Sequence, residues 1–167
     1  MSDQRDAAVR AVAVRFVAAR CGSGGDDLRV RIASDEVDQT DPTLRRVRVV
    51  QERPMSAYLA RYNARTGEPL GWFFDRLMVG SERGGVPPSE CLLEAIEVAQ
   101  PPEGAVLEHH GYEDLGGSAV FVARWRHEHE GVVVEHDGIE VRVNGRTGKA
   151  FALHRRWHEI DEASTDR

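Results

Sequence analysis

The chain of 167 residues predicts an α+β fold built from two similar units, each with one helix packed on an antiparallel sheet of about four strands. Two observations carry this prediction. A turn sequence of the form N-x-R-T-G occurs at residues 63–67 and again at residues 144–148. Before each copy, a helical pattern is followed by strand-like segments, so the order of elements repeats together with the turn.

The first unit is expected to span residues 1–79 and the second residues 89–160. Between them, residues 80–88 hold three glycines and two prolines, a composition typical of a linker. Residues 161–167 are mostly charged or polar, and we expect them to be a frayed tail.

In the first unit, residues 3–20 place apolar side chains at the spacing of an amphipathic helix: Val9, Val12, Ala13 and Phe16. The acidic and polar stretch 35–42 is expected to be a loop. Alternating apolar and polar residues, or aromatic and β-branched ones, predict the strands of this unit at residues 28–32, 47–51, 57–62 and 70–74.

In the second unit, residues 89–99 have the pattern of a helix whose apolar face consists of Leu92, Ala95, Ile96 and Ala99. Pro101 and Pro102 stop this helix. Strands are expected after it at residues 106–112, 118–127, 132–135, 139–143 and 149–157.

Composition limits the possible partners. The net charge is −6, with acidic and basic residues mixed along the chain, which weighs against nucleic-acid binding. The first residues lack the pattern of a secretory signal, and no segment is apolar enough to span a bilayer. Cys21 and Cys91 match no zinc pattern and are expected to be free thiols. We therefore expect a cytoplasmic protein that binds neither nucleic acid nor a membrane.

The turn sequences and their surroundings resemble the PepSY family and its relatives among metallopeptidase propeptides, in which a strand runs into a V-[ND]-x-x-T-G-[EK] turn. Residues 143–149 match this pattern, with Trp125 upstream and Trp157 closing the last strand. Residues 62–68 match it in the first unit, with Trp72 just beyond. The resemblance implies a non-catalytic regulatory or inhibitory module that binds another protein or a peptide.

A weaker resemblance is to cytosolic immunity proteins of bacterial toxin systems, several of which end a helix-and-sheet unit with a D-x-x-[ST]-G-E turn. It implies an alternative function, in which the acidic surface covers the basic active site of a toxin. The residues themselves suggest a third hypothesis. All seven histidines lie at or beyond His109, and a small metal- or ligand-binding enzyme would use this second unit.

His127 and His129 are two residues apart on an expected strand, so both would point to one face. With His154 or His158 from the neighbouring strand they would offer three imidazoles to a zinc or copper ion. Exposed histidines on a polar strand face are the commoner explanation of such a pattern. The sequence holds no HExxH, GxSxG, P-loop or GxGxxG motif, so we expect no catalytic residue and no cofactor.

The aromatic residues of both units give the predicted partner-binding surface: Trp72, Phe73, Phe74 and Trp125. Consecutive residues of a strand face opposite sides of the sheet, so residues 72–74 cannot all enter one core. One side is expected to meet the other unit, another chain or a ligand.

The turn residues are interpreted as structural: Asn63, Gly67, Asn144 and Gly148. A tight hairpin needs residues that tolerate positive φ, and Asn and Gly supply them. We expect positive φ at both glycines.

Overall fold

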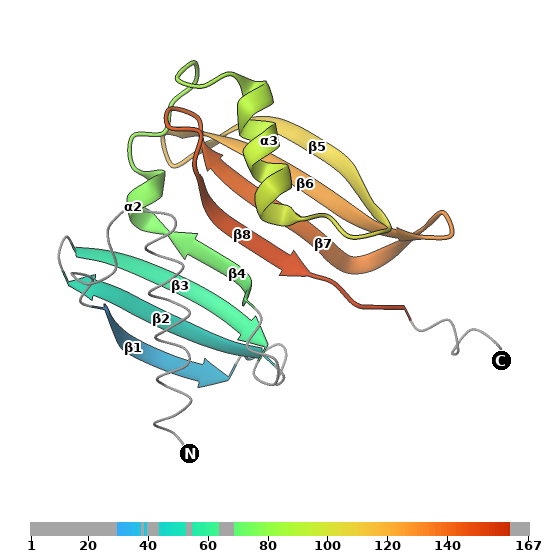
Figure 1. The fold of residues 1–167 in the computed structure, drawn as a ribbon, viewed down its shortest axis with the longest axis horizontal. Coiled ribbons are helices and arrows are strands. Elements are labelled where there is room, and N and C mark those ends of the chain that lie inside the picture. Colours follow the sequence, from blue (N-terminus) through green and yellow to red (C-terminus); the bar gives the residue numbers. More distant parts are fainter. Residues whose placement is uncertain (1–29, 38, 40–43, 53–54, 64–68, 161–167) are drawn as a thin grey trace. The chain divides into compact units, whose positions relative to one another are not determined.

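A computed structural model describes residues 30–37, 39, 44–52, 55–63 and 69–160 (Figure 1). The chain forms two compact units that divide between Arg76 and Leu77. The predicted first helix at residues 3–20, the turn at residues 64–68 with Gly67, and the predicted tail lie outside the described residues.

The first unit contains an antiparallel meander in the order β1-β2-β3-β4. Its strands are β1 (Val30–Val37), β2 (Leu44–Glu52), β3 (Met55–Asn63) and β4 (Pro69–Phe74). The loop predicted at residues 35–42 is wrong in its first part, because β1 continues to Val37. There the backbone pairs with β2, Glu36 lying opposite Arg46, and this pairing outweighs the low strand propensity of acidic residues.

The second unit begins within the short helix α2 (Asp75–Met78) and places one longer helix on an antiparallel sheet. Its elements are α3 (Pro88–Ala99), β5 (Ala105–Leu115), β6 (Ser118–His129), β7 (Val132–Asn144) and β8 (Ala150–Arg156). The strands follow one another in the sheet as β5-β6-β7-β8, and α3 lies across one face (Figure 1). The predicted α+β class, a helix packed on an antiparallel sheet, is confirmed.

Two of the predicted strands, at residues 132–135 and 139–143, are one strand in the structure. The polar residues 136–138 look like a break in the sequence, yet β7 runs through them. His136 takes up the irregularity by adopting a left-handed backbone conformation with φ of 68°. The β6–β7 register also shifts nearby, between Arg126 and Glu128, so the ladder bends and continues.

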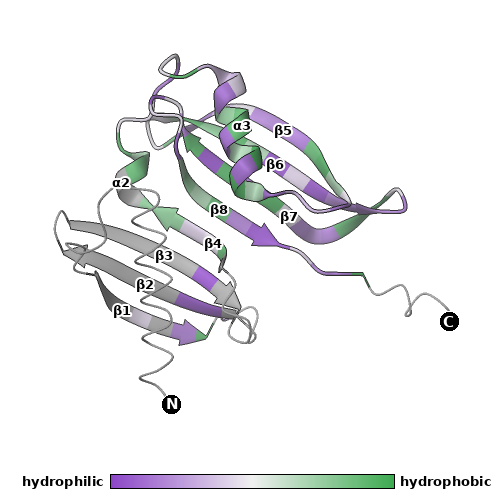
Figure 2. Cartoon of the chain, in the orientation of Figure 1, coloured by the Kyte–Doolittle hydropathy of each residue, from purple (hydrophilic) through white to green (hydrophobic). Residues whose placement is uncertain are grey.

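The core of the second unit lies between α3 and the sheet. Side chains at every fourth position of α3 are fully buried, namely Cys91, Ala95 and Ala99. On the sheet face that α3 covers, alternate residues of β6 and β7 are buried against these side chains, among them Phe121, Ala123, Trp125, Ile139 and Val141. Figure 2 shows the resulting alternation of apolar and polar bands along the strands. Cys91 is a free thiol, as expected.

The turn after β7 is held by one side chain, Asn144, which is 1% exposed. Its Oδ1 accepts hydrogen bonds from the backbone N–H groups of Arg146 (2.9 Å) and Thr147 (3.2 Å). Its Nδ2 donates to the carbonyl oxygens of Leu77 (2.8 Å) and Val79 (3.3 Å). All four hydrogen-bonding positions of the carboxamide are therefore used.

Gly148 closes the same turn, with its N–H donating to Asn144 O at 2.8 Å. Its φ of 71° confirms the positive value expected from the sequence. A Cβ at this position would lie 3.2 Å from a methyl carbon of Val86, so the glycine also permits close packing.

Residues 80–88, predicted as a linker, belong to the second unit and pack against this turn. Val86 N–H donates to Gly145 O at 2.8 Å, and Ser81 Oγ bridges Gly145 N–H and Ala119 O. The glycines here serve close backbone approach: a Cβ at Gly85 would collide with the backbone of Arg146. The glycines of residues 80–88 thus allow this segment to pack closely on the turn after β7.

No helix among the described residues combines the length and apolar character that crossing a bilayer requires.

We predict that Asn144→Ala lowers the free energy of unfolding by about 3 kcal/mol, because it removes four hydrogen bonds and leaves buried backbone groups without partners. Asn144→Asp keeps the acceptor and loses the donor, so it should also destabilise. Urea unfolding followed by circular dichroism measures both, with the exposed Lys149→Ala as control. A stable Asn144→Asp variant would contradict the account of the Leu77 and Val79 contacts.

Gly148→Val should lower the free energy of unfolding by about 1–2 kcal/mol, because a β-branched residue is strained at positive φ. Gly116→Val is the matched control. Gly116 also has positive φ (60°), but nothing lies within 4 Å of an added Cβ there. The same unfolding titration should show a larger loss at Gly148, and equal losses would mean that contact with Val86 is unimportant.

Candidate functional site

The sheet of the second unit carries a network of charged side chains on the face opposite α3, which we call the charged face. Arg124 is its centre. The guanidinium donates two parallel hydrogen bonds to the carboxylate of Glu113, at 2.7 and 3.0 Å, and its Nε donates to Glu140 at 2.7 Å. Arg142 Nε donates to the other oxygen of Glu140 at 2.8 Å. The bidentate geometry fixes the orientation of Arg124.

Strand register explains why these residues meet. Arg124 of β6 lies opposite His109 of β5 and Glu140 of β7, and Glu140 lies opposite His154 of β8. Four strands therefore contribute one residue each to a single row across the sheet. Opposite charges on neighbouring strands stabilise such a row.

The arginines keep the carboxylates of the network ionised. Hydrogen bonding to Arg124 lowers the pKa of Glu113. Burial alone would raise the pKa of Glu140, but hydrogen bonds from Arg124 and Arg142 outweigh it and the pKa is lowered. The same contacts raise the pKa of Arg124. These groups are suited to hold charge and donate or accept hydrogen bonds.

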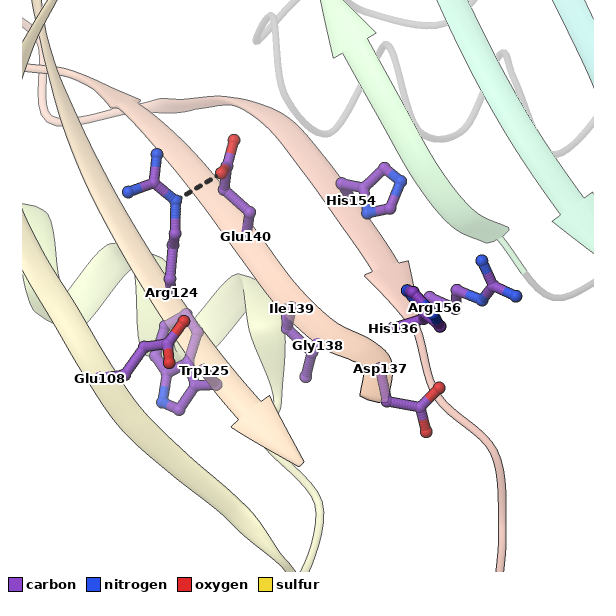
Figure 3. A pocket seen from close by; sticks show the side chains of 10 residues that line it. All are labelled: Glu108, Arg124, Trp125, His136, Asp137, Gly138, Ile139, Glu140, His154 and Arg156. Carbon is purple, nitrogen blue, oxygen red and sulfur yellow. Dashed lines mark hydrogen bonds and ion pairs between the residues drawn. The ribbon is translucent and has the colours of Figure 1, made fainter. Parts of the chain in front are cut away.

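Next to this row the charged face has an open hollow of about 250 Å³ (Figure 3). Its cause is Gly138, which lies between Arg126 and Arg156 in the register and carries no side chain. A Cβ at Gly138 would lie 2.9 Å from Trp125 O, so the position admits only glycine without rearrangement. Glu108 borders one end of the hollow, and His154 and Arg156 border the other (Figure 3).

Two backbone irregularities place side chains at the hollow. Glu108 is the extra residue where the β5–β6 register shifts between Leu107 and His109. A bulge of this kind redirects a side chain relative to its neighbours. His136, with its positive φ, also lines the hollow and is exposed to solvent. Strained residues of this type are concentrated at functional sites.

A buried carboxylate lies behind the hollow, at the end of the sheet. The Asp137 side chain has no exposed area and lies 2.9 Å from His127 Nδ1 and 2.6 Å from His158 Nδ1. It also accepts the backbone N–H of His158 at 2.8 Å. Burial would raise the pKa of Asp137, but the hydrogen bonds from His127 and His158 hold it below its ordinary value.

His127 further stacks on Trp157, with ring centroids 3.9 Å apart and planes 17° apart. Together these contacts fasten the segment after β8 to the β6–β7 hairpin. His127 is bonded to Asp137 and stacked on Trp157, and Asp137 is bonded to both histidines, so we interpret this cluster as structural.

The structure does not bring the three histidines considered as metal ligands together. His127 shares the α3 face of the sheet with Trp125, whereas His154 is in the row of the charged face. His129 lies at the hairpin end, opposite Val132. Among the described residues, no group of three His, Cys, Asp or Glu side chains has the arrangement of a metal site.

The aromatic residues proposed as a partner-binding surface are mostly buried. Trp72 and Phe74 lie on one face of β4, and their exposed fractions are 5% and 1%. Their rings are in edge-to-face contact, with centroids 5.6 Å apart. Phe73 faces the other side and is half-buried. Trp125 is part of the core under α3. The alternation expected for residues 72–74 is present, but these side chains form no exposed apolar patch.

The predictions from the sequence did not include the hydrogen-bonded network around Arg124 or the hollow at Gly138. The alternation of charged residues in Arg124-Trp125-Arg126 and Glu140-Val141-Arg142 was a signal for a charged strand face. The partners across the sheet depend on register and on two bulges, which local patterns do not reveal.

Comparison with known proteins gives one informative likeness. No family model matches the chain, and no curated protein does. Among solved structures, the Bacillus megaterium YpeB C-terminal domain is similar, with a TM-score of 0.61 over 90% of this chain and 67% of that chain. The two are 13% identical in sequence, so the likeness concerns the fold alone.

The lowered pKa values give a prediction for stability against pH. A carboxylate whose pKa is lower in the folded chain contributes stability that is present above its unfolded pKa and lost as pH falls through the folded value. The ordinary values are 4.5 for Glu113 and Glu140 and 3.8 for Asp137. The free energy of unfolding should therefore be level from neutral pH down to the region of 4.5 as far as these groups are concerned, and decrease below it.

Arg124→Gln should remove this contribution from Glu113 and Glu140 and should lower the free energy of unfolding at pH 7 by about 1–2 kcal/mol. Denaturant titrations between pH 3 and 7 test it. The decrease below about pH 4.5 should be smaller in the variant, because both glutamates lose the cation that lowers their pKa in the folded chain and titrate closer to their unfolded values. Arg156→Gln is the control and should leave the profile unchanged, and an unchanged profile in Arg124→Gln would contradict the role of the network.

Proposed function

We propose that this protein is a non-catalytic, PepSY-like regulatory module that binds a peptide segment of another protein on the charged face of its second unit. The observation that carries the proposal is the open hollow at Gly138, bordered by a network whose carboxylates are held ionised by Arg124 and Arg142. The likeness in fold to the YpeB domain supports the PepSY part of it.

The electrostatics of the site favour recognition over catalysis. General acid–base catalysis works best when the pKa of a side chain lies near the operating pH. At the hollow, the pKa of Glu140 is lowered, away from neutral pH, and the pKa of nearby Asp137 is also lowered. Groups of fixed charge in a fixed orientation can select a ligand by hydrogen bonds and ion pairs.

The size of the hollow also favours a peptide. At about 250 Å³ it is smaller than the roughly 300–1,000 Å³ of pockets that enclose drug-sized ligands. It is open to solvent and has an acidic end at Glu108 and a basic end at Arg156 (Figure 3). One or two side chains of an extended segment would fit, with their charges opposite to those of the two ends.

His136 supports the same conclusion. A histidine at φ of 68° costs more than a glycine would, and it lies on the border of the hollow. Retaining a strained imidazole at this position is understandable if the side chain contacts a ligand.

We also propose that the two units are copies of one element. Within the described part of the chain, each unit has four strands in an antiparallel meander, and in each the N-x-R-T-G sequence lies between the last two strands. An experimental structure that resolves residues 1–76 tests this idea. A helix lying on the sheet of β1–β4 as α3 lies on β5–β8 supports duplication, and a different topology rules it out.

The binding proposal is tested by selecting a random peptide library against the intact chain and measuring the affinities of the selected peptides. Arg156→Glu should weaken these peptides by about tenfold or more, because it reverses the charge at one end of the hollow. Arg83→Glu is the control, since Arg83 is exposed and outside the hollow. Failure to select any peptide, or equal loss in both variants, would count against the proposal.

His136→Gly separates stability from binding. It should raise the free energy of unfolding by about 1 kcal/mol, because glycine relieves the left-handed strain, and it should weaken the selected peptides. Glu130→Gly is the matched control: Glu130 has φ of 49°, in the β6–β7 turn and outside the hollow. It should stabilise the fold without changing peptide affinity. Unchanged affinity in His136→Gly would exclude a ligand contact for this imidazole.

A further inference from the structure

A second surface of the same unit lies on the other side of the sheet, where α3 meets the turn after β7. A groove of about 320 Å³ runs between them, with Val86 and Leu93 as its apolar residues and the backbone of Thr147 and Gly148 as one wall. The remaining residues that line it are acidic: Glu90, Glu94 and Glu97. No described residue that lines it is a lysine or an arginine.

No segment among the residues that the structure describes covers the apolar part of the groove. Cys91, Ala95 and Ala99 face the core, so the opposite side of α3 points to solvent. There Leu93 is 66% exposed. Ile96 does not line the groove and is 40% exposed. A single exposed leucine is common on protein surfaces, but this one forms the side of a groove, next to a turn held rigidly by hydrogen bonds.

The acidic part is ordered along the helix. Glu90, Leu93 and Glu97 follow one another at spacings of three and four residues, so one leucine is flanked by a carboxylate on each side. Glu94 is held in place because its Oε1 accepts the backbone N–H of Ala150 at 3.1 Å. The groove thus presents negative charge around one apolar side chain in a chain of net charge −6.

The groove is preformed. Val86 is tied to the turn by its N–H bond to Gly145 O at 2.8 Å, and its carbonyl oxygen lies 3.4 Å from the Tyr112 hydroxyl, which donates to it. Gly148 leaves room for the Val86 side chain, whose methyl carbons would crowd any added Cβ. A rigid surface loses less conformational entropy on binding than a mobile one.

From these observations we propose that the groove along α3 is a docking surface for a basic segment of a partner protein, with one apolar side chain between lysine or arginine residues. The apolar side chain would pack on Leu93 and Val86, and the flanking cations would pair with Glu90 and Glu97. Apolar contact at the centre and charge pairing at the rim is the usual arrangement of a protein interface. The proposal is independent of the peptide site on the charged face.

The test uses three fluorescent twelve-residue peptides and the intact chain. The first has a central leucine flanked by lysines, the second has serine in place of leucine, and the third has glutamates in place of lysines. Fluorescence anisotropy at physiological salt should show binding of the first, weaker binding of the second by about tenfold, and none of the third.

Variants then locate the site. Leu93→Ser and Glu97→Lys should each weaken the first peptide by about tenfold. Val132→Ser and Glu103→Lys are the matched controls, since Val132 is 68% exposed and Glu103 is exposed, both outside the groove. All four replace exposed residues, and denaturant midpoints confirm that the variants are folded.

Three results would overturn the proposal. Equal affinity for the leucine and serine peptides would show attraction by charge alone. Equal loss in Glu97→Lys and Glu103→Lys would show that no particular surface is used. Unchanged affinity in Leu93→Ser would place the peptide elsewhere on the chain, and loss in Arg156→Glu instead would assign it to the charged face.

Discussion

The second unit depends on the buried carboxamide of Asn144. The two acceptor and two donor positions of this side chain connect three stretches of chain: the end of α2 with the residue after it (Leu77 and Val79), the end of β7, and the turn at Arg146 and Thr147. A buried amide is costly unless every polar atom has a partner, so the side chain fixes all three stretches at once. The turn after β7 also positions residues 80–88, and these residues lead into α3. The same turn leads into β8, whose His154 completes the row of residues on the charged face.

Glycines shape both surfaces for which we propose a function. On the charged face, Gly138 has no side chain to fill the hollow. The position requires glycine, because an added Cβ would lie 2.9 Å from the Trp125 carbonyl oxygen. At the groove, Gly148 allows Val86 to pack against the turn. The surrounding charges are arranged differently. Around the hollow they are paired through Arg124, whereas the charged residues that line the groove along α3 are all acidic. The two faces are therefore suited to ligands of different charge.

The sequence was informative where structure is local. The apolar spacing of residues 89–99 predicted α3 to within one residue, and Asn144 with Gly148 predicted the turn and its backbone conformation. It was misleading where contacts are distant. The glycines of residues 80–88 suggested a linker between the units, but they allow close approach to a turn about sixty residues later. The partner of His127 is Asp137, and Glu108 borders the hollow at a bulge in β5. Both depend on strand register, and the spacing of apolar residues in the sequence does not predict which residues of two strands lie opposite each other.

The central claim is that the charged face of the second unit binds a peptide. The most direct measurement is the amide spectrum of the isotopically labelled chain during titration with a peptide selected from the random library. Our account predicts that shifts concentrate at His136, Gly138, Glu140 and Arg156, the residues that border the hollow. Shifts confined to other elements, or a spectrum unchanged at saturating peptide, would contradict it.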